Sequence, residues 1–316
     1  MSIDGQIGRP IHSSRIAATS VRRVYAAARS GMKRYPRALL ESVWRMGTRD
    51  VRMQDGRQAP PDLDPHDLAA MWLGHATVLV RLCGVNILMD PVFSDRIGVT
   101  VGGVTIGLPR LAPMPFDPRH LPEIDLVLVS HAHFDHLDRP TLQGLTSSRT
   151  VVVTAKRTKR LIPPGFGRVI ELDWGQDMVF RGLHISALRP AHWGARTALD
   201  RRRGYNSYTI REAKDGRGVL LAGDTALTSA FDSLDNLALA VFGVGSYEPW
   251  EHAHATPEQA WRMFTGSRAA RLLPVHHSTF PMGDEKLGEP MSRLLAAAGE
   301  DSGRVIVAEP GGMWAE

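Results

Sequence analysis

Short apolar runs alternate with polar turns from Ala69 to the end of the chain. Several of these runs are continuous and rich in β-branched residues, which is typical of strands buried on both faces. We therefore predict strands over residues 70–73, 77–82, 86–89, 125–130, 150–154, 169–172, 178–180, 184–188, 207–211, 218–222, 237–242, 271–275 and 305–308.

Fewer segments show a helical pattern. Thr256-Pro257-Glu258 indicates a helix start, because Thr caps the first turn, Pro is tolerated at its first position and an acidic residue suits its N-terminus. We predict a helix from there to about residue 265, a second over residues 284–298, and others at 156–161 and 229–234. Many strands with few helices predict a layered α/β sandwich of the α+β type.

Positive charge is concentrated at the N-terminus. Residues 1–60 hold twelve Lys and Arg against four acidic residues, a net charge of +8, whereas the whole chain carries +5. Apolar residues recur there at helical spacing, so we predict a basic, partly helical extension, joined to the body by the Pro-rich segment 55–67. A basic amphipathic helix can bind anionic lipid, and a solvated helix on its own domain is the other interpretation. No DNA-binding motif accompanies the charge, so we expect no nucleic-acid partner.

Composition narrows the functional class. The single cysteine, Cys83, excludes an internal disulfide and a zinc site built from several thiolates. No apolar run reaches the ~20 residues that a membrane-spanning helix needs, so we expect a cytoplasmic protein, peripheral at a membrane if the basic extension binds lipid. The 13 histidines are many for 316 residues and direct attention to metal ligands.

The segment Ser130-His-Ala-His-Phe-Asp-His136 places four potential metal ligands directly after a predicted buried strand. The two imidazoles of a His-x-His pair lie on one side of an extended segment. A loop at a strand end is held by the scaffold and is open to solvent. Imidazole and carboxylate donors suit zinc, with iron and manganese as alternatives.

Further donors follow three other predicted strands: His192, Asp224 and His276. If these strand ends share one edge of the sandwich, the donors converge on one pocket. Gly223, which has no side chain, allows the backbone just before Asp224 to approach its neighbours closely. A carboxylate can bridge two cations, and two metals can hold one hydroxide between them. The sequence therefore predicts a metal centre.

These motifs resemble those of the metallo-β-lactamase superfamily, and within it the branch that contains N-acylphosphatidylethanolamine-hydrolysing phospholipase D. The resemblance spans roughly residues 70–310. It rests on Trp72-Leu-Gly-His75-Ala-Thr77, Asp90-Pro-Val-Phe-Ser-Asp95, Ser130-His-Ala-His-Phe-Asp-His-Leu-Asp138, Pro190-Ala-His-Trp193, Ala222-Gly-Asp-Thr225, Gly245-Ser-Tyr-Glu-Pro249, His254-Ala-Thr-Pro-Glu258 and His276-His-Ser-Thr-Phe280.

The resemblance implies a four-layer αββα sandwich, with residues 61–316 as the hydrolase domain and two Zn²⁺ ions as cofactors. It implies that one zinc is held by His131, His133 and His192, the other by Asp135, His136 and His276, and that Asp224 bridges them.

The resemblance also assigns roles beside the metals. Asp135 would act in catalysis as a ligand rather than as a free base. His75 would orient a ligand or the hydroxide, and Asp90 would support a ligand histidine. His254 would stabilise an oxyanion or donate a proton. Phe134 and Trp193 are interpreted as wall residues.

The expected chemistry is hydrolysis by a metal-bridging hydroxide, because zinc lowers the pKa of bound water to ~7. The resemblance favours a phosphodiesterase of the N-acylphosphatidylethanolamine phospholipase D type, with a phospholipid substrate. The alternatives are a hydrolase of lactones or other small esters, and a non-catalytic metal-binding or sensing protein. An apolar groove beside the metals would favour lipid, and a small pocket with a basic corner would favour sugar-phosphate lactones. The oligomeric state stays open, a homo-oligomer included.

Overall fold

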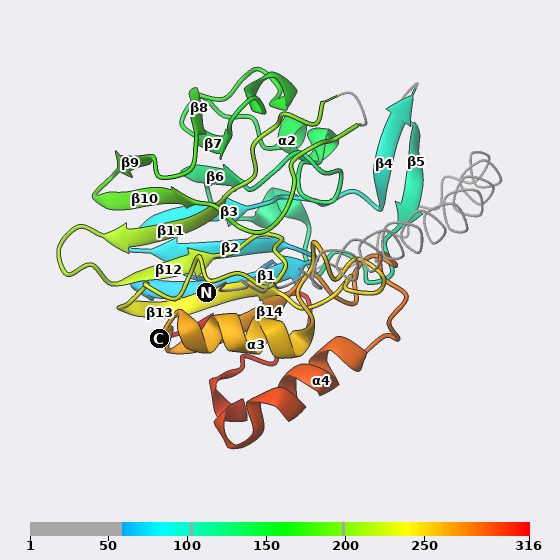
Figure 1. The fold of residues 1–316 in the computed structure, drawn as a ribbon. Coiled ribbons are helices and arrows are strands. Elements are labelled where there is room, and N and C mark those ends of the chain that lie inside the picture. The colour runs from blue at the N-terminus through cyan, green and yellow to red at the C-terminus, as the bar shows by residue number, and fades with distance from the viewer. Residues whose placement is uncertain (1–58, 102–103, 198–199) are drawn as a thin grey trace, which may run out of the picture.

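The structure, a computed structural model, describes residues 59–101, 104–197 and 200–316. The predicted helical extension of residues 1–60 lies almost entirely outside these ranges. Two sheets stack against each other, and a separate hairpin projects from one end of the sandwich (Figure 1).

The first sheet has seven strands in the order β15-β1-β2-β3-β6-β7-β8. Their bounds are Leu68–Gly74 for β1, Thr77–Leu82 for β2, Val85–Met89 for β3, Leu126–Val129 for β6, Val151–Ala155 for β7, Arg168–Leu172 for β8 and Met313–Ala315 for β15. Strands β3, β6, β7 and β8 run parallel, and β2 lies antiparallel between β1 and β3. The central strands are buried on both faces, which explains their unbroken apolar sequences.

The second sheet has six strands in the order β14-β13-β12-β11-β10-β9. Their bounds are Asp177–Phe180 for β9, Leu183–Leu188 for β10, Ser207–Glu212 for β11, Gly218–Leu221 for β12, Leu237–Gly243 for β13 and Arg271–Val275 for β14. Strands β9 to β12 are antiparallel neighbours, and β12, β13 and β14 run parallel. The projecting hairpin pairs β4 (Arg96–Val101) with β5 (Val104–Pro109).

Helical elements cover the outer faces. They are α2 (Arg139–Gly144), α3 (Pro257–Gly266) and α4 (Glu289–Ala298), with the 3-10 helices η2 (Pro118–His120), η3 (Lys159–Leu161) and η4 (Gly299–Arg304). Helix α3 begins as predicted, because the Thr256 side chain accepts from the backbone N–H of Gln259, whose own side chain accepts from the N–H of Thr256.

Three apolar layers confirm the four-layer αββα sandwich. Trp72 and Tyr208 belong to the layer between the two sheets. Phe264 and Leu294 join the helices α3 and α4 to the outer face of the second sheet. Leu142 of α2 belongs to the layer on the outer face of the first sheet. Burial of these layers removes apolar surface from water, which is the main favourable term in folding.

Several local predictions were wrong. Residues 305–308 form no strand, because Val305 makes only an isolated bridge to Leu272. Helix α4 begins at Glu289 rather than at 284, since Gly288 has a φ of 83°, outside the helical range. Residues 229–234 form turns, and only a short 3-10 helix forms within 156–161. The sequence prediction also lacked β4, β5, β15 and α2.

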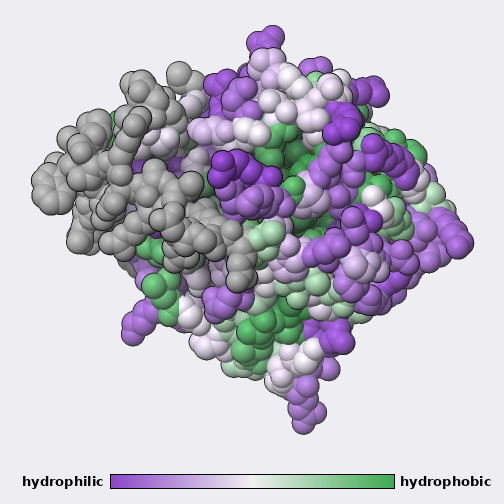
Figure 2. Space-filling view, turned by 180° about the vertical axis from the view of Figure 1, so that it is seen from behind, coloured by the Kyte–Doolittle hydropathy of each residue, from purple (hydrophilic) through white to green (hydrophobic). Residues whose placement is uncertain are grey.

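The described part of the face seen from behind carries many hydrophilic residues (Figure 2). In the view from behind, hydrophobic residues show in a hollow in the upper half and in a patch near the lower edge, each bordered by hydrophilic residues (Figure 2). Within the ranges that the structure describes, no helix combines the length and the apolar character needed to span a membrane.

Candidate metal centre

One edge of the sandwich collects the ends of six strands. In the first sheet β1, β3 and β6 point the same way, and in the second sheet β10, β12 and β14 do so. The loops that follow these ends carry His75, Asp90, the segment 131–136, His192, Asp224 and His276. Because these strands end at the same edge, residues that are far apart in the sequence lie close together, as at the ligand sites of other open sheets.

The first donor group contains His131, His133, His192 and Asp224, and one ligand atom of each lies within 4.8 Å of the others. The Nε2 of His131 lies 2.8 Å from the Nδ1 of His133, which lies 3.4 Å from the Nε2 of His192. The Oδ2 of Asp224 lies 3.8 Å from His131 Nε2 and 3.7 Å from His192 Nε2. These nitrogens and this oxygen face one another, as ligands around a cation do.

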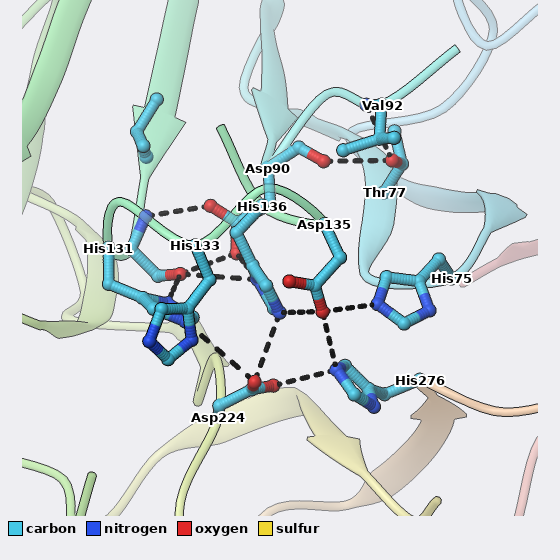
Figure 3. Close-up of polar contacts among 12 residues, drawn as sticks. His75, Thr77, Asp90, Val92, His131, His133, Asp135, His136, Asp224 and His276 are labelled. Carbon is cyan, nitrogen blue, oxygen red and sulfur yellow. Dashed lines mark hydrogen bonds and ion pairs between the residues drawn. The ribbon is translucent and has the colours of Figure 1, made fainter. Parts of the chain in front are cut away.

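The second donor group contains Asp135, His136 and His276, together with His75. The Oδ2 of Asp135 lies 3.3 Å from the Nε2 atoms of both His136 and His276. The Asp224 carboxylate reaches this group as well, with Oδ2 3.1 Å from His136 Nε2 and Oδ1 3.3 Å from His276 Nε2. Figure 3 shows Asp224 between the two groups. The structure thus brings all seven predicted ligands together.

Orphaned polar atoms at the centre test whether a metal fits. Asp224 Oδ2, His136 Nε2 and His276 Nε2 are buried and make no hydrogen bond. Buried polar atoms without a partner are costly, so such atoms facing one another fit a cation-binding site. The donor set of imidazoles and carboxylates without thiolate suits a divalent metal such as zinc. The residues therefore fit the metal that the sequence predicts.

The pKa values of the histidines are also consistent with a metal-binding site. Burial lowers the pKa of His131 and of His192 well below the usual imidazole range, so both are in the neutral form that binds metals. Burial also acts to lower the pKa of His276, but Asp224 and Asp135 outweigh it and raise that pKa to about 9. The negative charge that attracts a proton to His276 would equally attract a divalent cation.

Hydrogen bonds outside the donor groups fix the orientation of the rings. His136 Nδ1 lies 2.7 Å from Asp90 Oδ2, and His192 Nδ1 donates to the carbonyl of Ala253 at 2.9 Å. Because each Nδ1 carries the hydrogen, the Nε2 lone pair of each ring points to the centre. The structure therefore places Asp90 against a predicted ligand histidine.

The two other predicted catalytic histidines also lie at the centre. His75 is buried, and its Nε2 lies 2.9 Å from Asp135 Oδ2. His254 forms a third donor group with Asp224 and His276, and its Nδ1 lies 3.8 Å from Asp224 Oδ2. Both rings have a low pKa, about 3 for His75 and about 4 for His254, because burial disfavours the charged form.

A mostly apolar pocket of about 300 Å³ opens onto the donors. Its polar lining includes Asp135, Asp224 and His254, and its apolar wall includes Ile97, Leu108, Phe134, Trp193, Trp250 and Met282. The part of the wall from the β4–β5 hairpin was not predicted, although the long uncharged run over residues 97–109 was a signal for it.

Arg196 is a further residue that the sequence analysis missed. Its Nη1 donates to the carbonyls of Ala132 and Leu137 at 2.9 and 2.8 Å, and its guanidinium carbon lies 3.9 Å from the ring centre of Phe134. These contacts clamp both ends of the loop that carries the first four donors. Carbonyls and a ring face engage the guanidinium, and contacts of this kind leave no pattern in the sequence.

Comparisons with known proteins agree with the fold and the site. A family model described as a beta-lactamase superfamily domain matches residues 85–277. The N-acyl-phosphatidylethanolamine-hydrolyzing phospholipase D 1 of Caenorhabditis elegans is 32% identical over 258 residues, which cover 74% of this chain and 71% of that protein. An uncharacterized protein of Mycobacterium tuberculosis is 32% identical over 267 residues, 78% of this chain and 68% of its own length.

The fold is also found in solved structures. A possible metal-dependent hydrolase from Veillonella parvula superposes with a TM-score of 0.64 at 15% identity, covering 79% of this chain and 100% of that one. The sandwich and its donor groups define a metal-dependent hydrolase. The chain belongs to the beta-lactamase superfamily, on the branch that contains the phospholipase D of C. elegans, which confirms the predicted resemblance.

Proposed function

We propose that the protein is a dinuclear, zinc-dependent phosphodiesterase that acts on a phospholipid of the N-acylphosphatidylethanolamine type. The observation that carries the proposal is the position of Asp224 between two donor groups at the base of an apolar pocket. Two relatives named as N-acyl-phosphatidylethanolamine-hydrolyzing phospholipase D, at 32% and 30% identity, support the substrate class.

In this proposal His131, His133 and His192 hold one metal, Asp135, His136 and His276 hold the other, and Asp224 contacts both. When bound, such metals lower the pKa of water toward ~7 and stabilise charge on a phosphoryl oxygen.

The remaining residues of the site bind the substrate and orient the metal ligands. His75 donates from Nε2 to Asp135 Oδ2 and so holds that carboxylate in place. His254 lies in the pocket wall with a neutral ring, which can donate a hydrogen bond to charge that develops on the substrate. The apolar wall removes an acyl chain from water and keeps water from the reacting phosphate.

The shape of the pocket favours a lipid over the alternatives. A sugar-phosphate lactone bound in this apolar pocket would need a free basic corner within it. The arginine of this pocket, Arg196, donates to the backbone of Ala132 and Leu137, and its pKa is lowered to about 10 by burial. Contact of the basic segment 1–60 with a membrane surface stays a prediction, because that segment lies outside the described residues.

The first experiment compares Asp224→Ala with the exposed control Asp177→Ala. Bound metal and turnover are measured on a panel of N-acylated phospholipids, lactones and cyclic nucleotides. We expect two zinc ions in wild type. Asp224→Ala should lose metal and its kcat should fall at least ~100-fold, whereas the control should show no change. Full activity of Asp224→Ala would refute the metal role, and turnover of lactones alone would refute the substrate.

The second experiment tests the apolar wall with Leu108→Asn on the β4–β5 hairpin. Long-chain and short-chain versions of one substrate are compared. Each buried methylene contributes about 0.8 kcal/mol, so we expect kcat/KM to fall roughly tenfold for the long chain and little for the short one. An equal fall for both would show that the hairpin wall does not bind the chain.

A further inference from the structure

A second pocket, of about 350 Å³, adjoins the metal centre. Its lining includes Arg189, His192, Trp193, Tyr205, Thr228 and His252, and we refer to it as the arginine pocket. Trp193 also lines the apolar pocket, so the two pockets meet at its indole. A substrate whose reacting group lies on the metals can therefore extend one arm into each pocket.

Aromatic side chains fix the cation of the arginine pocket. The guanidinium carbon of Arg189 lies 4.4 Å from the ring centre of Trp174. Trp174 is itself held, because its Nε1 donates to the carbonyl of Tyr205 at 2.6 Å and its ring meets that of Tyr205 at 5.0 Å. A guanidinium stacked on a ring keeps its N–H groups available in the plane, where they can bind two oxygens at once.

The charge around Arg189 is uncompensated. Among the described residues no carboxylate forms an ion pair with Arg189, and the lining of the arginine pocket contains no acidic residue. A neighbouring pocket at Trp193 adds Arg201, and its lining contains no acidic residue. Positive charge without acidic partners in a concave site attracts anions.

Neutral donors complete the arginine pocket. The Thr228 oxygen accepts from the backbone N–H of Ala230 at 3.2 Å, which leaves its own hydrogen available to donate. The Tyr205 hydroxyl is a further donor in the lining. One guanidinium with two hydroxyls matches the oxygens of a phosphate or carboxylate, and does not match an apolar chain.

We infer that the arginine pocket binds a second anionic group of the substrate, a phosphate or carboxylate on the arm opposite the apolar chain. This inference rests on the proposed phosphodiesterase activity and narrows its substrate: neither arm of N-acylphosphatidylethanolamine is acidic, so the favoured phospholipid is a relative of that type that carries an added phosphate or carboxylate on its polar arm. Arg189 is then the residue that discriminates such substrates from diesters with a neutral polar arm.

The test uses the metal-loaded enzyme and two diesters that differ only at the end of the polar arm, which carries a phosphate in one and a hydroxyl in the other. Wild type should prefer the phosphate arm. Arg189→Gln should lower kcat/KM for that diester roughly tenfold, as expected for the loss of a charge-assisted pair, and change the hydroxyl diester less than twofold. Thr228→Val should act in the same direction with a smaller effect.

Arg181 provides a matched control. It precedes β10, whereas Arg189 follows it, and its guanidinium also stacks on an aromatic ring, that of Phe180 at 5.4 Å. Arg181→Gln should leave the ratio of the two kcat/KM values unchanged. An unchanged ratio in Arg189→Gln, or an equal loss on both diesters, would overturn the inference.

Addition of free sulfate distinguishes an anion that is part of the substrate from a free anion in the arginine pocket. Sulfate should compete with the phosphate arm and reduce the preference of wild type. If sulfate instead stimulates turnover of the hydroxyl diester, a free anion fills the pocket and the inference about the substrate is wrong. Turnover of neither diester by wild type would refute the proposed function itself, and the substrate inference with it.

Discussion

The hydroxyl of Ser130 lies 2.6 Å from the Oδ2 of Asp90, in a position where both side chains are shielded from solvent. Since a carboxylate only accepts, the hydroxyl donates to it. The Ser130 oxygen can then accept from His131 Nδ1, which lies 2.9 Å away. The same Asp90 oxygen lies 2.7 Å from His136 Nδ1. One buried carboxylate therefore orients a histidine in each donor group, directly in one and through Ser130 in the other.

Replacing Asp90 with Asn should weaken metal binding in both donor groups. Asp90 Oδ2 serves the Ser130 hydroxyl and the His136 ring, and Oδ1 accepts from the backbone N–H of Ser130 at 2.7 Å. An amide offers a single acceptor atom in place of two, so its NH2 group would face a donor at one of these positions. We expect a fall of about 10- to 100-fold in affinity for both metals, measured by chelator competition. The exposed substitution Asp177→Asn is the control, and unchanged affinity at either site would contradict the shared role of Asp90.

Ser130→Ala should act on one donor group only. It removes the acceptor for His131 Nδ1 but leaves the contact of Asp90 with His136 intact. We expect roughly a tenfold loss of affinity at one metal, resolved by stepwise Co²⁺ titration with optical detection. Thr154→Val, which removes a buried hydroxyl without a hydrogen bond, should change neither step. Equal losses at both metals would show that Ser130 does not act through His131.

His75→Ala should separate catalysis from metal content. The substitution removes the hydrogen bond to Asp135 Oδ2 but none of the seven proposed ligands. We expect kcat to fall at least tenfold with KM and bound zinc near their wild-type values, because a carboxylate without its partner is held less firmly. His184→Ala on the exposed face of β10 is the control. Loss of zinc in His75→Ala would instead show that the contact with Asp135 serves metal binding rather than catalysis.

The pH dependence of stability tests the contact between α3 and α4. Glu258 accepts from Arg293 Nε at 2.9 Å and Nη2 at 2.8 Å, and these hydrogen bonds lower its pKa from 4.5 to about 2. Because the pKa of Glu258 is lower in the folded state than in the unfolded state, its ionised form stabilises the folded protein at pH values above the unfolded pKa. This stabilisation is lost as the pH falls from about 5 toward 2. Because both side chains are partly exposed, we expect less than about 1 kcal/mol.

The measurement is the melting temperature of metal-free protein against pH. Glu258→Gln should be less stable than wild type at pH 7 and should approach it near pH 2. The exposed substitution Glu300→Gln should follow the wild-type curve. A constant difference between Glu258→Gln and wild type across this range would exclude the ion pair as the cause.

The donor-bearing strands could be predicted because they are buried on both faces, and their ligands follow the strand ends within a few residues. The link from Ser130 to Asp90 could not, since it depends on the parallel pairing of β3 and β6, which brings together residues 40 positions apart. The β4–β5 hairpin stands off the sandwich, and its apolar residues alternate with small or polar ones, with Val99 53% exposed, so it lacks the continuous buried run by which the central strands were predicted. Arg196 acts through backbone carbonyls, which have no sequence signature.

The central claim is that two metals share Asp224. Anomalous diffraction at the zinc edge, on crystals of protein loaded with zinc, measures this most directly. We predict two peaks about 3.5–4 Å apart, one beside His131, His133 and His192 and one beside Asp135, His136 and His276, with the Asp224 carboxylate between them. A single peak, or two peaks that Asp224 does not join, would contradict the account.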